Sequence, residues 1–262
     1  MDDARWWKIG ALGLALWLTA APGHAQQSAA TTASTEEKAR ATLMNAAEFL
    51  ATAPRLSVKA DISYDVSQDS GQKLEFGATR VITVKRPDRI SMDIVDRDGT
   101  KRGFRFDGKQ IAFFGVDEQV YATADKAGDV DAAFAYFTQD LQMPLPMGEL
   151  FTNNLPKGLK DRFREAYDVE EATLGGVPCD HLALRNDMAD AQVWVTQGDK
   201  PLLNRMVITY KRENGQPEFR ADFRDWNFAA EAPDSVFTFT PAEGAARIQF
   251  VAGMDPNVGK NP

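Results

Sequence analysis

The stretch LSVKADISYDV, residues 56–66, decides the fold class. Every second residue in it is apolar, and the residues between are mostly polar; the apolar positions are Leu56, Val58, Ala60, Ile62, Tyr64 and Val66. Successive side chains of a β-strand point to opposite faces of the sheet, so this period of two predicts a strand with one dry face and one wet face.

The same period continues through the segments that follow. Its apolar positions are Leu74, Phe76, Ala78, Ile82, Val84, Ile90, Met92, Ile94, Phe104, Phe106, Ile111 and Phe113. Turn signals such as Asp98-Gly99 and Asp107-Gly108 separate the runs. Asp-Gly suits a two-residue hairpin turn because both central residues need a positive φ angle. Short strands joined by tight turns predict an antiparallel meander.

Helical spacing appears in two other regions. Residues Ala39, Leu43, Ala46, Ala47 and Leu50 recur at helical spacing. They predict a helix that begins at a capping box of Ser34 and Glu37 and stops at Pro54. Residues Val130, Phe134, Phe137 and Leu141 predict a second helix, and a third should run from Leu159 to near Tyr167. Further strands are expected at 168–175, 177–185, 190–196, 202–212, 216–228 and 235–240.

About ten to twelve antiparallel strands with a single dry face predict a mainly β fold with some α (α+β). A sheet of that size curls toward closure, and the amphipathic helices should cover its concave, dry face. The pattern alone leaves open whether the inner side chains meet in a solid core or enclose a cavity.

The first 25 residues have the features of a signal peptide. Arg5 and Lys8 precede an apolar run of 13 residues, Ile9 to Ala21, and small residues lead up to a cleavage site after Ala25. The run is shorter than the roughly 20 residues that span a bilayer, so we expect a periplasmic protein without a transmembrane anchor after cleavage. The predicted organisation is a signal peptide at 1–25, a disordered leader at 26–33, a single β-rich domain at 34–252 and a flexible tail at 253–262.

Charge and residue types exclude several functions. The net charge of -8 repels phosphate backbones, so no nucleic-acid partner is expected. The one cysteine, Cys179, cannot form an internal disulfide. After signal removal, His181 is the sole histidine. Cys179 and His181 together are fewer than the three or four ligands that a zinc site requires. No phosphate-binding glycine loop occurs either. We therefore expect no metal and no cofactor.

Catalytic residues are also hard to assign. Cys179 and His181 lie two apart on one predicted strand, an arrangement that seldom aligns a nucleophile with its base. The carboxylates mostly occupy wet strand positions or turns, although their number keeps a paired-carboxylate hydrolase as an alternative. The prediction is that the protein has no catalytic residue and is not an enzyme.

Two arginines interrupt the apolar register. Arg80 falls between Ala78 and Ile82, and Arg205 falls between Leu203 and Val207. A charge that faces a dry interior is costly unless it is paired. One interpretation is that such an arginine contacts a polar headgroup or a lid residue at a cavity mouth. The other is a bulge or strand end that places the arginine in solvent.

The C-terminal half carries a recognisable series of motifs. They are Cys179-Asp180-His181-Leu182, Gln192-Val193-Trp194-Val195, Gly198-Asp199-Lys200-Pro201, Val207-Ile208-Thr209-Tyr210, Pro217, Asp225-Trp226, Phe237-Thr238-Phe239, Pro241 and Gly244-Ala245, with Phe106-Asp107-Gly108-Lys109 in the first half. Together they resemble a family of predicted periplasmic proteins whose fold is related to the lipoprotein carrier LolA and to the mycobacterial lipoprotein LppX. This resemblance implies an incomplete β-barrel, with a helical lid over an apolar cavity that accepts acyl chains.

The sequence thus predicts a carrier or binding protein for a lipid, a lipoprotein acyl chain or another hydrophobic ligand. Its partner would be that ligand or a lipidated protein. The predicted cavity residues are Val58, Ala60, Ile62, Tyr64, Phe76, Ala78, Arg80, Ile82, Met92, Ile94, Phe104, Phe106, Phe113, Phe134 and Phe137. The alternative is an envelope interaction or sensor module without a small-molecule ligand, because an envelope-stress regulator contains a domain of similar fold.

Overall fold

The computed structural model describes residues 23–143, 145, 147–160 and 162–250. The predicted signal peptide at 1–25 lies almost wholly outside the described residues, and the predicted tail at 253–262 lies wholly outside them. Within the described ranges, no helix combines the length and the apolar character that a membrane crossing requires.

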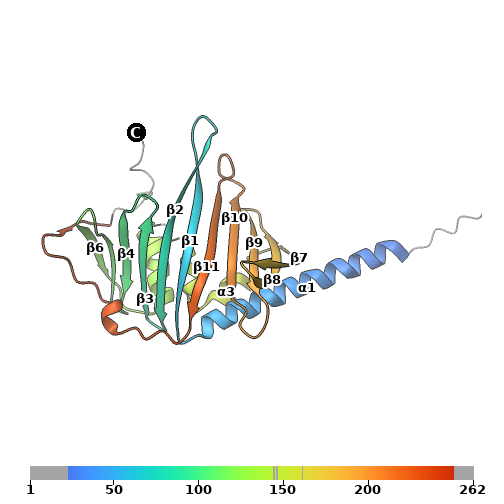
Figure 1. The fold of residues 1–262 in the computed structure, drawn as a ribbon, viewed down its shortest axis with the longest axis horizontal. Helices are drawn as coiled ribbons and strands as arrows, with labels where there is room; N and C mark the ends of the chain where they lie inside the picture. The colour runs from blue at the N-terminus through green and yellow to red at the C-terminus, as the bar shows by residue number, and fades with distance from the viewer. Residues whose placement is uncertain (1–22, 144, 146, 161, 251–262) are drawn as a thin grey trace, which may run out of the picture.

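A single curved sheet of twelve strands forms most of the molecule (Figure 1). The strands are β1 (Arg55–Ser67), β2 (Lys73–Lys85), β3 (Arg89–Asp96), β4 (Lys101–Phe106), β5 (Gln110–Gly115), β6 (Val120–Asp125), β7 (Glu165–Leu174), β8 (Val177–Arg185), β9 (Ala189–Thr196), β10 (Leu203–Tyr210), β11 (Glu218–Asn227) and β12 (Ala246–Arg247). Their order is β12-β6-β5-β4-β3-β2-β1-β11-β10-β9-β8-β7.

The topology joins two meanders through one central strand. β1 pairs antiparallel with β2 on one side and with β11 on the other, so the first strand lies between the halves. The short β12 pairs in parallel with β6 at one edge, and β7 forms the other edge. The sheet therefore curves without closing, which confirms the predicted incomplete barrel with an N-terminal helix.

The helices pack against the inner face of the curve. They are α1 (Gly23–Thr52), α2 (Val130–Ala135), the π-helix η1 (Tyr136–Asp140), the 3-10 helix η2 (Gly148–Phe151) and α3 (Leu155–Lys160). A further 3-10 helix, η3 (Asp234–Val236), has no buried residue and is not part of this layer. α1 contacts β7 and β9 and also packs on α3 and η2, so it covers the half of the sheet formed by β7–β11. η1 covers the other half, where the Phe137 ring packs edge-on against Phe104 at 5.1 Å.

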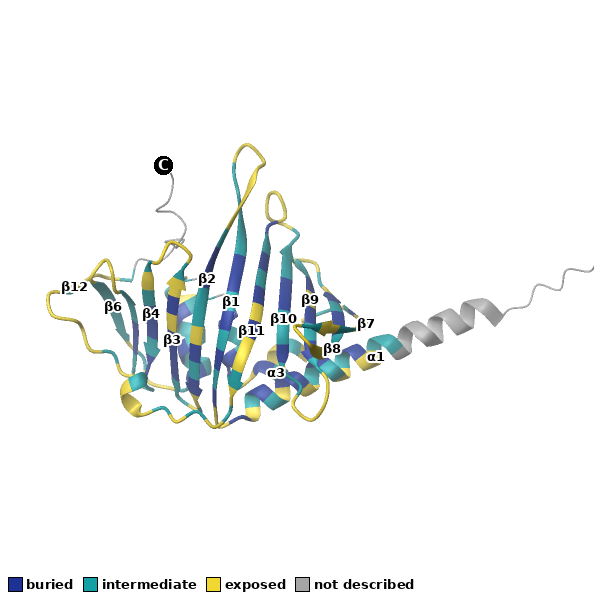
Figure 2. Cartoon of the chain, in the orientation of Figure 1, coloured by how far each residue is buried: buried dark blue, intermediate teal, exposed yellow. Residues whose placement is uncertain are grey.

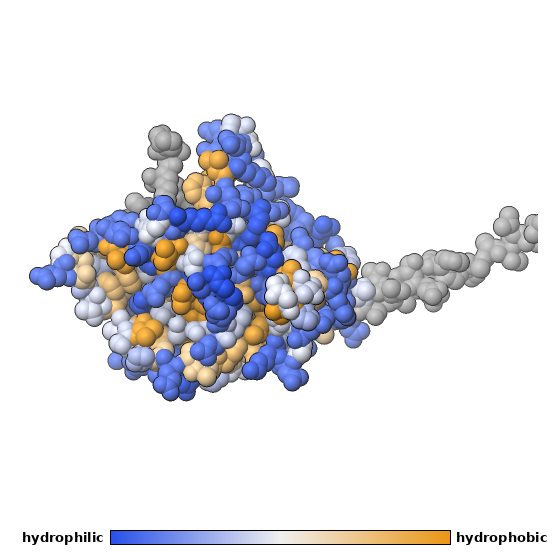
Figure 3. Space-filling model, in the orientation of Figure 1, coloured by the Kyte–Doolittle hydropathy of each residue, from blue (hydrophilic) through white to orange (hydrophobic). Residues whose placement is uncertain are grey.

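Burial confirms the predicted register of the first strands (Figure 2). Leu56, Val58, Ala60 and Ile62 of β1 are each at most 3% exposed. The outer face is seen in Figure 3, where hydrophilic residues predominate and hydrophobic ones are scattered. Gly99 and Gly108 adopt φ angles of 92° and 87° at the predicted hairpins, where a side chain would be strained.

Several predicted boundaries were wrong. α1 begins at Gly23, so residues 26–33 are helical instead of a disordered leader, and the Ser34–Glu37 capping box lies inside the helix. The segment is alanine-rich and adjoins a formed helix, so its extension needs no new nucleus. The helix expected to reach Tyr167 ends at Lys160, because β7 already begins at Glu165.

Two strand assignments also need correction. Residues 235–240 are not a strand: η3 starts this segment, and its alternating phenylalanines anchor it instead. Phe237 is fully buried and Phe239 stacks on Phe114 at 4.9 Å. The strand β6 was missed because its inward positions, such as Ala122, carry little hydrophobic signal.

One arginine joins two of the helices that cover the inner face, α1 and η2. Arg86, directly after β2, donates hydrogen bonds to the carbonyls of Leu50 and Ala53 in and after the last turn of α1. It also donates to the Phe151 carbonyl of η2 and to Asn153 Oδ1, at 3.0 and 2.7 Å. Helix ends leave carbonyls without intrahelical partners, and this side chain satisfies several of them at once.

Candidate functional site

An apolar cavity of about 330 Å³ lies beneath the half of the sheet that α1 covers. Side chains from α1, from the segment 145–163 and from the inner face of β8–β10 surround it. They include Leu43, Ala46, Ala47, Leu50, Phe134, Leu145, Met147, Leu150, Leu155, Leu159, Phe163, Leu184, Ala189, Ala191, Val193, Leu203, Met206, Ile208 and Tyr210. The polar residues around it are few: Glu149, Arg162 and Asn186.

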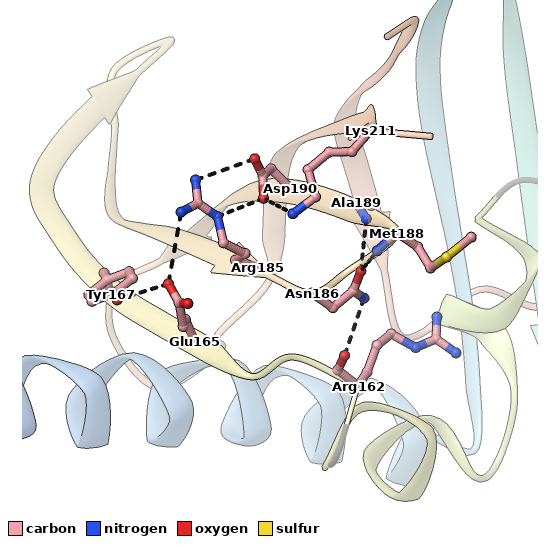
Figure 4. Close-up of polar contacts among 9 residues, drawn as sticks. All are labelled: Arg162, Glu165, Tyr167, Arg185, Asn186, Met188, Ala189, Asp190 and Lys211. Atoms are coloured by element: carbon pink, nitrogen blue, oxygen red, sulfur yellow. Dashed lines mark hydrogen bonds and ion pairs between the residues drawn. The ribbon is translucent and has the colours of Figure 1, made fainter. Parts of the chain in front are cut away.

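Those polar residues connect the lid segment, which is the described part of 145–163, to the sheet at the rim of the cavity. Asn186 accepts hydrogen bonds from the amides of Met188 and Ala189, both at 2.8 Å, and donates to the Arg162 carbonyl at 3.2 Å (Figure 4). The Arg162 guanidinium forms a two-pronged ion pair with Glu149. The cavity wall is thus apolar, and the few polar groups around it already have hydrogen-bond or ion-pair partners.

Beside the rim, a second cluster of charges holds the β8–β9 hairpin. Asp190 binds Arg185 at 2.9 Å and Lys211 at 3.1 Å (Figure 4). The hydrogen bond from Arg185 is the main reason that the pKa of Asp190 lies below its usual range. This carboxylate therefore stays ionised and structural near neutral pH.

A second, more polar space of about 670 Å³ adjoins the cavity under β1–β5. Leu145 and Tyr210 line both spaces, so the two spaces lie next to each other. The residues around the second space are Ile62, Tyr64, Asp65, Ala78, Arg80, Ile94, Asp96, Arg102, Phe113, Phe137, Thr138, Gln142, Met143, Leu145, Tyr210, Glu213, Pro217, Glu218 and Phe219. The inner face therefore contains an apolar cavity next to a second space that is bordered by charged residues.

The charges of the second space fall into two groups. On β2–β4, Arg102 donates to both oxygens of Asp96 at 2.7 Å, and Arg80 lies near this pair. Burial, and then repulsion by Arg102, lower the pKa of Arg80 to about 10, so it remains protonated at neutral pH. Asp65 and Glu218 also border the space, and Arg220 binds Asp65 at 3.0 Å and also binds Glu218.

Asp65 is not suited to act as a general acid. Burial alone would raise its pKa, but hydrogen bonds from Arg220 and from the Glu218 amide outweigh this effect and leave the pKa below its ordinary value. A general acid needs the opposite shift, toward neutral pH. Among the residues that the structure describes, no three histidine, cysteine or acidic side chains are grouped so that they could hold a metal ion.

Comparison with known proteins identifies the family. The profile of a family described as predicted periplasmic protein (DUF2092) matches residues 39–251. The chain belongs to this family. The description confirms the predicted periplasmic location. No curated protein has a matching sequence.

Solved structures with a similar course of the chain share little sequence with this DUF2092 protein. The lipoprotein LppX of Mycobacterium tuberculosis is 11% identical, with a TM-score of 0.46 over 75% of this chain and 98% of that one. A LolA superfamily protein from Nitrosomonas europaea is 13% identical, with a TM-score of 0.42 over 77% and 97%. MucB in its complex with MucA from Pseudomonas aeruginosa is 16% identical, with a TM-score of 0.42 over 77% and 61%.

The predicted cavity residues of the DUF2092 protein occupy three kinds of place. Ile62, Tyr64, Ala78, Arg80, Ile94, Phe113 and Phe137 line the second space, and Phe134 lines the apolar cavity. Val58, Ala60, Ile82, Met92, Phe104 and Phe106 are core residues, each at most 2% exposed, and line neither space. Phe76 also lines neither, and its ring stacks on Tyr64 at 6.0 Å.

Most residues of the apolar cavity were missing from the prediction. The sequence did contain their signal, since Leu182, Leu184, Ala191, Val193 and Val195 follow the same period of two. The predicted cavity residues were instead taken from the first meander and from the segment that follows it. Large side chains fill space, however, and small ones leave it open.

The two arginines that interrupt the apolar register lie on different faces of the sheet. A register shift between Leu203 and Arg205 places Arg205 on the outer face, where it binds Asp222 at 2.7 Å and lies over the Trp194 ring. The bulge interpretation is therefore correct for Arg205. Arg80 faces the second space instead, at the polar end of the candidate site.

Cys179 and His181 each contact other groups. The Cys179 thiol is buried and lies 3.5 Å from the Val177 carbonyl, and burial raises its pKa. His181 contacts Gln192 Oε1 at 3.0 Å and stacks on Trp194 at 4.2 Å. A raised thiol pKa lowers the fraction of nucleophilic thiolate, which is the reverse of an activated cysteine.

Proposed function

We propose that this protein is a periplasmic carrier or binding protein that holds a hydrophobic ligand non-covalently beneath its lid and carries out no catalysis. The ligand would be a lipid or the acyl chain of a lipoprotein. The observation that carries the proposal is the apolar cavity of about 330 Å³ between α1, the lid segment and β8–β10.

The energetics of burial suit this task. Each methylene removed from water contributes about 0.8 kcal/mol, so a long acyl chain gains on the order of 10 kcal/mol before the entropy costs of binding are subtracted. The lining is aliphatic and aromatic, and its polar groups, Glu149 and Arg162, are already paired with each other. A hydrocarbon chain would therefore displace no hydrogen bond that it could not replace.

The first experiment asks what the protein carries. The chain is purified from the periplasm and examined by native mass spectrometry, and bound molecules are extracted and identified. We expect a lipid or fatty acid at up to one copy per chain, and stripped protein should take up a fluorescent fatty acid. Protein that is purified without a bound lipid or fatty acid and that also takes up no fluorescent probe would contradict the proposal.

A pair of variants locates the binding in the cavity. Ala191 faces the cavity from β9, so Ala191→Phe should fill it and reduce probe binding by about tenfold or more. Ala183, on the neighbouring strand β8, alternates with the buried Leu182 and Leu184 and is partly exposed on the outer face. Ala183→Phe is therefore the matched control and should bind normally. Equal binding by both variants would place the ligand elsewhere.

A second candidate function, an envelope interaction module, is favoured by the free edge of the sheet. β7 has a neighbour on one side only, and Tyr167 and Val169 on this strand are 38% and 50% exposed. Open strand edges can pair with an extended segment of another protein. Crosslinking in intact envelopes separates the candidates: a stoichiometric protein partner without bound lipid would support the module.

A further inference from the structure

The charged wall of the second space has a geometry that a purely hydrocarbon ligand would not need. Ile94 on β3 pairs directly with Arg80 on β2 and with Arg102 on β4. Since neighbouring strands lie about 4.8 Å apart, the two arginine backbones are only about 10 Å from each other. Both side chains line the same space, so their long stems can bring the two guanidinium groups together over Ile94.

This wall carries more arginines than carboxylates. Among the described residues, Asp96, two residues beyond Ile94 on β3, is the one carboxylate that lines the space from β2–β4, and both of its oxygens accept from Arg102. The wall therefore presents two arginines and one carboxylate to the space. In addition, Arg102 Nε is buried without a hydrogen-bond partner among the described residues. A buried donor of this kind gains free energy when an acceptor arrives.

We propose that Arg80 and Arg102 bind the anionic headgroup, a carboxylate or a phosphate, of an amphiphile whose acyl chain occupies the apolar cavity. This inference rests on the proposed function and specifies the class of ligand. An oxyanion would accept charge-assisted hydrogen bonds from both guanidinium groups. Leu145 and Tyr210 line both spaces, so a chain attached to that headgroup has a direct route into the cavity.

Carboxylates elsewhere around the space restrict where the anion can lie. Asp65, Glu213 and Glu218 line the space from the side of β1 and the β10–β11 turn. Arg220 binds Asp65 and Glu218, so it neutralises only part of this wall. These carboxylates repel an anion and confine it to the arginine side, which fixes the orientation of the ligand: headgroup at β2–β4 and chain toward β8–β10.

The test compares three probes that share one oleoyl chain: oleate, oleoyl lysophosphatidic acid and monooleoylglycerol. The first two carry a carboxylate and a phosphate, and the third is uncharged. Competition against a bound fluorescent fatty alcohol measures each affinity below the micellar concentration. We expect both anionic probes, or one of them, to bind about tenfold more tightly than monooleoylglycerol, with the better one identifying the oxyanion.

Variants assign this preference to the two arginines. Arg80→Gln and Arg102→Gln should each reduce it to about threefold or less, while Arg102→Lys retains part of it. Arg97→Gln is the matched control, since Arg97 is 57% exposed and binds Glu75 on the outer face. Circular dichroism and thermal unfolding show whether each variant is folded, and monooleoylglycerol binding shows whether its cavity is intact.

The outcomes separate this inference from the function on which it depends. Equal affinity of the wild-type protein for all three probes would overturn the headgroup site and leave a lipid carrier. A preference that survives in the Arg80→Gln/Arg102→Gln double variant would overturn it as well. If no oleoyl probe binds at all, the proposed function itself fails.

Discussion

The two halves of the inner face follow the same alternation of residues but are filled differently. Under β2–β5, Phe104 packs edge-on against the η1 residue Phe137, both are at most 2% exposed, and the space of about 670 Å³ that remains beside them has charged residues in its wall. Under β8–β10, a cavity of about 330 Å³ remains, and its lining is almost wholly apolar. The difference lies in the size and charge of the side chains that border each space.

Small residues meet across the open half. Ala46 and Ala47 of α1 line the cavity opposite Ala189 and Ala191 of β9. Interiors are otherwise packed to the density of organic crystals, so alanines on two facing elements leave space that no neighbour fills. The comparison teaches that alternation identifies the dry face, whereas the size and charge of the residues on both covering layers decide what kind of space remains beneath it.

The largest expected effect comes from uncoupling α1 from η2, two of the helices that cover the inner face. Arg86→Met keeps much of the side-chain volume but removes the hydrogen bonds to Leu50, Ala53, Phe151 and Asn153. Because partly buried carbonyls then lose their donor, we expect a loss of about 3–5 kcal/mol in the free energy of unfolding. Urea denaturation followed by tryptophan fluorescence measures this. A loss below about 1 kcal/mol would mean that the coverings are held by other contacts.

A matched pair of truncations tests the filling itself. Ile82 in the packed half is 0% exposed and Leu184 in the open half is 2% exposed. Ile82→Ala should cost about 4 kcal/mol because it creates a new void, whereas Leu184→Ala should cost only about 2 kcal/mol because its neighbours already border a cavity. Chemical denaturation of the ligand-free protein gives both values. Equal costs would show that the two halves are packed alike.

Much of the fold was accessible from the sequence for a simple physical reason. Strands such as β1, with alternating Leu56, Val58, Ala60 and Ile62, carry a strong local signal, and glycines with positive φ mark their turns. Weak strands such as β6 and segments held by distant contacts, such as Phe239 on Phe114, carry no such signal. The pairing of β1 with β11 joins residues more than 150 apart, which local patterns do not reveal.

The candidate site was predicted only in part. Arg80 could be singled out from the sequence because a charge in an apolar register is visible in one strand. Arg102 could not, because its position near Arg80 follows from the pairing of both residues with Ile94 on the strand between them. The apolar cavity under β8–β10 was not predicted, since a cavity depends on which elements are brought together, as Ala47 of α1 and Ala191 of β9 both line this one.

The smallest expected effect concerns pH and distinguishes the polar space from the apolar one. Burial would raise the pKa of Asp65, but hydrogen bonds from Arg220 and from the Glu218 amide outweigh it, so the pKa lies below its ordinary value in the folded protein. A carboxyl with a depressed folded pKa contributes stability above its unfolded pKa and loses it as the pH falls through the folded pKa. Asp65→Asn should therefore cost about 1 kcal/mol at pH 7 and almost nothing near pH 2.

Leu184→Ala provides the contrast, because no titrating group is removed from the apolar cavity and its cost should not change with pH. Unfolding curves of the wild-type protein and both variants across this pH range measure the two differences. A cost of Asp65→Asn that persists unchanged at the lowest pH would indicate lost packing instead of a lost ion pair. The charged wall would then stabilise the fold through shape rather than charge, and the division of the inner face into a polar and an apolar chamber would lose its electrostatic basis.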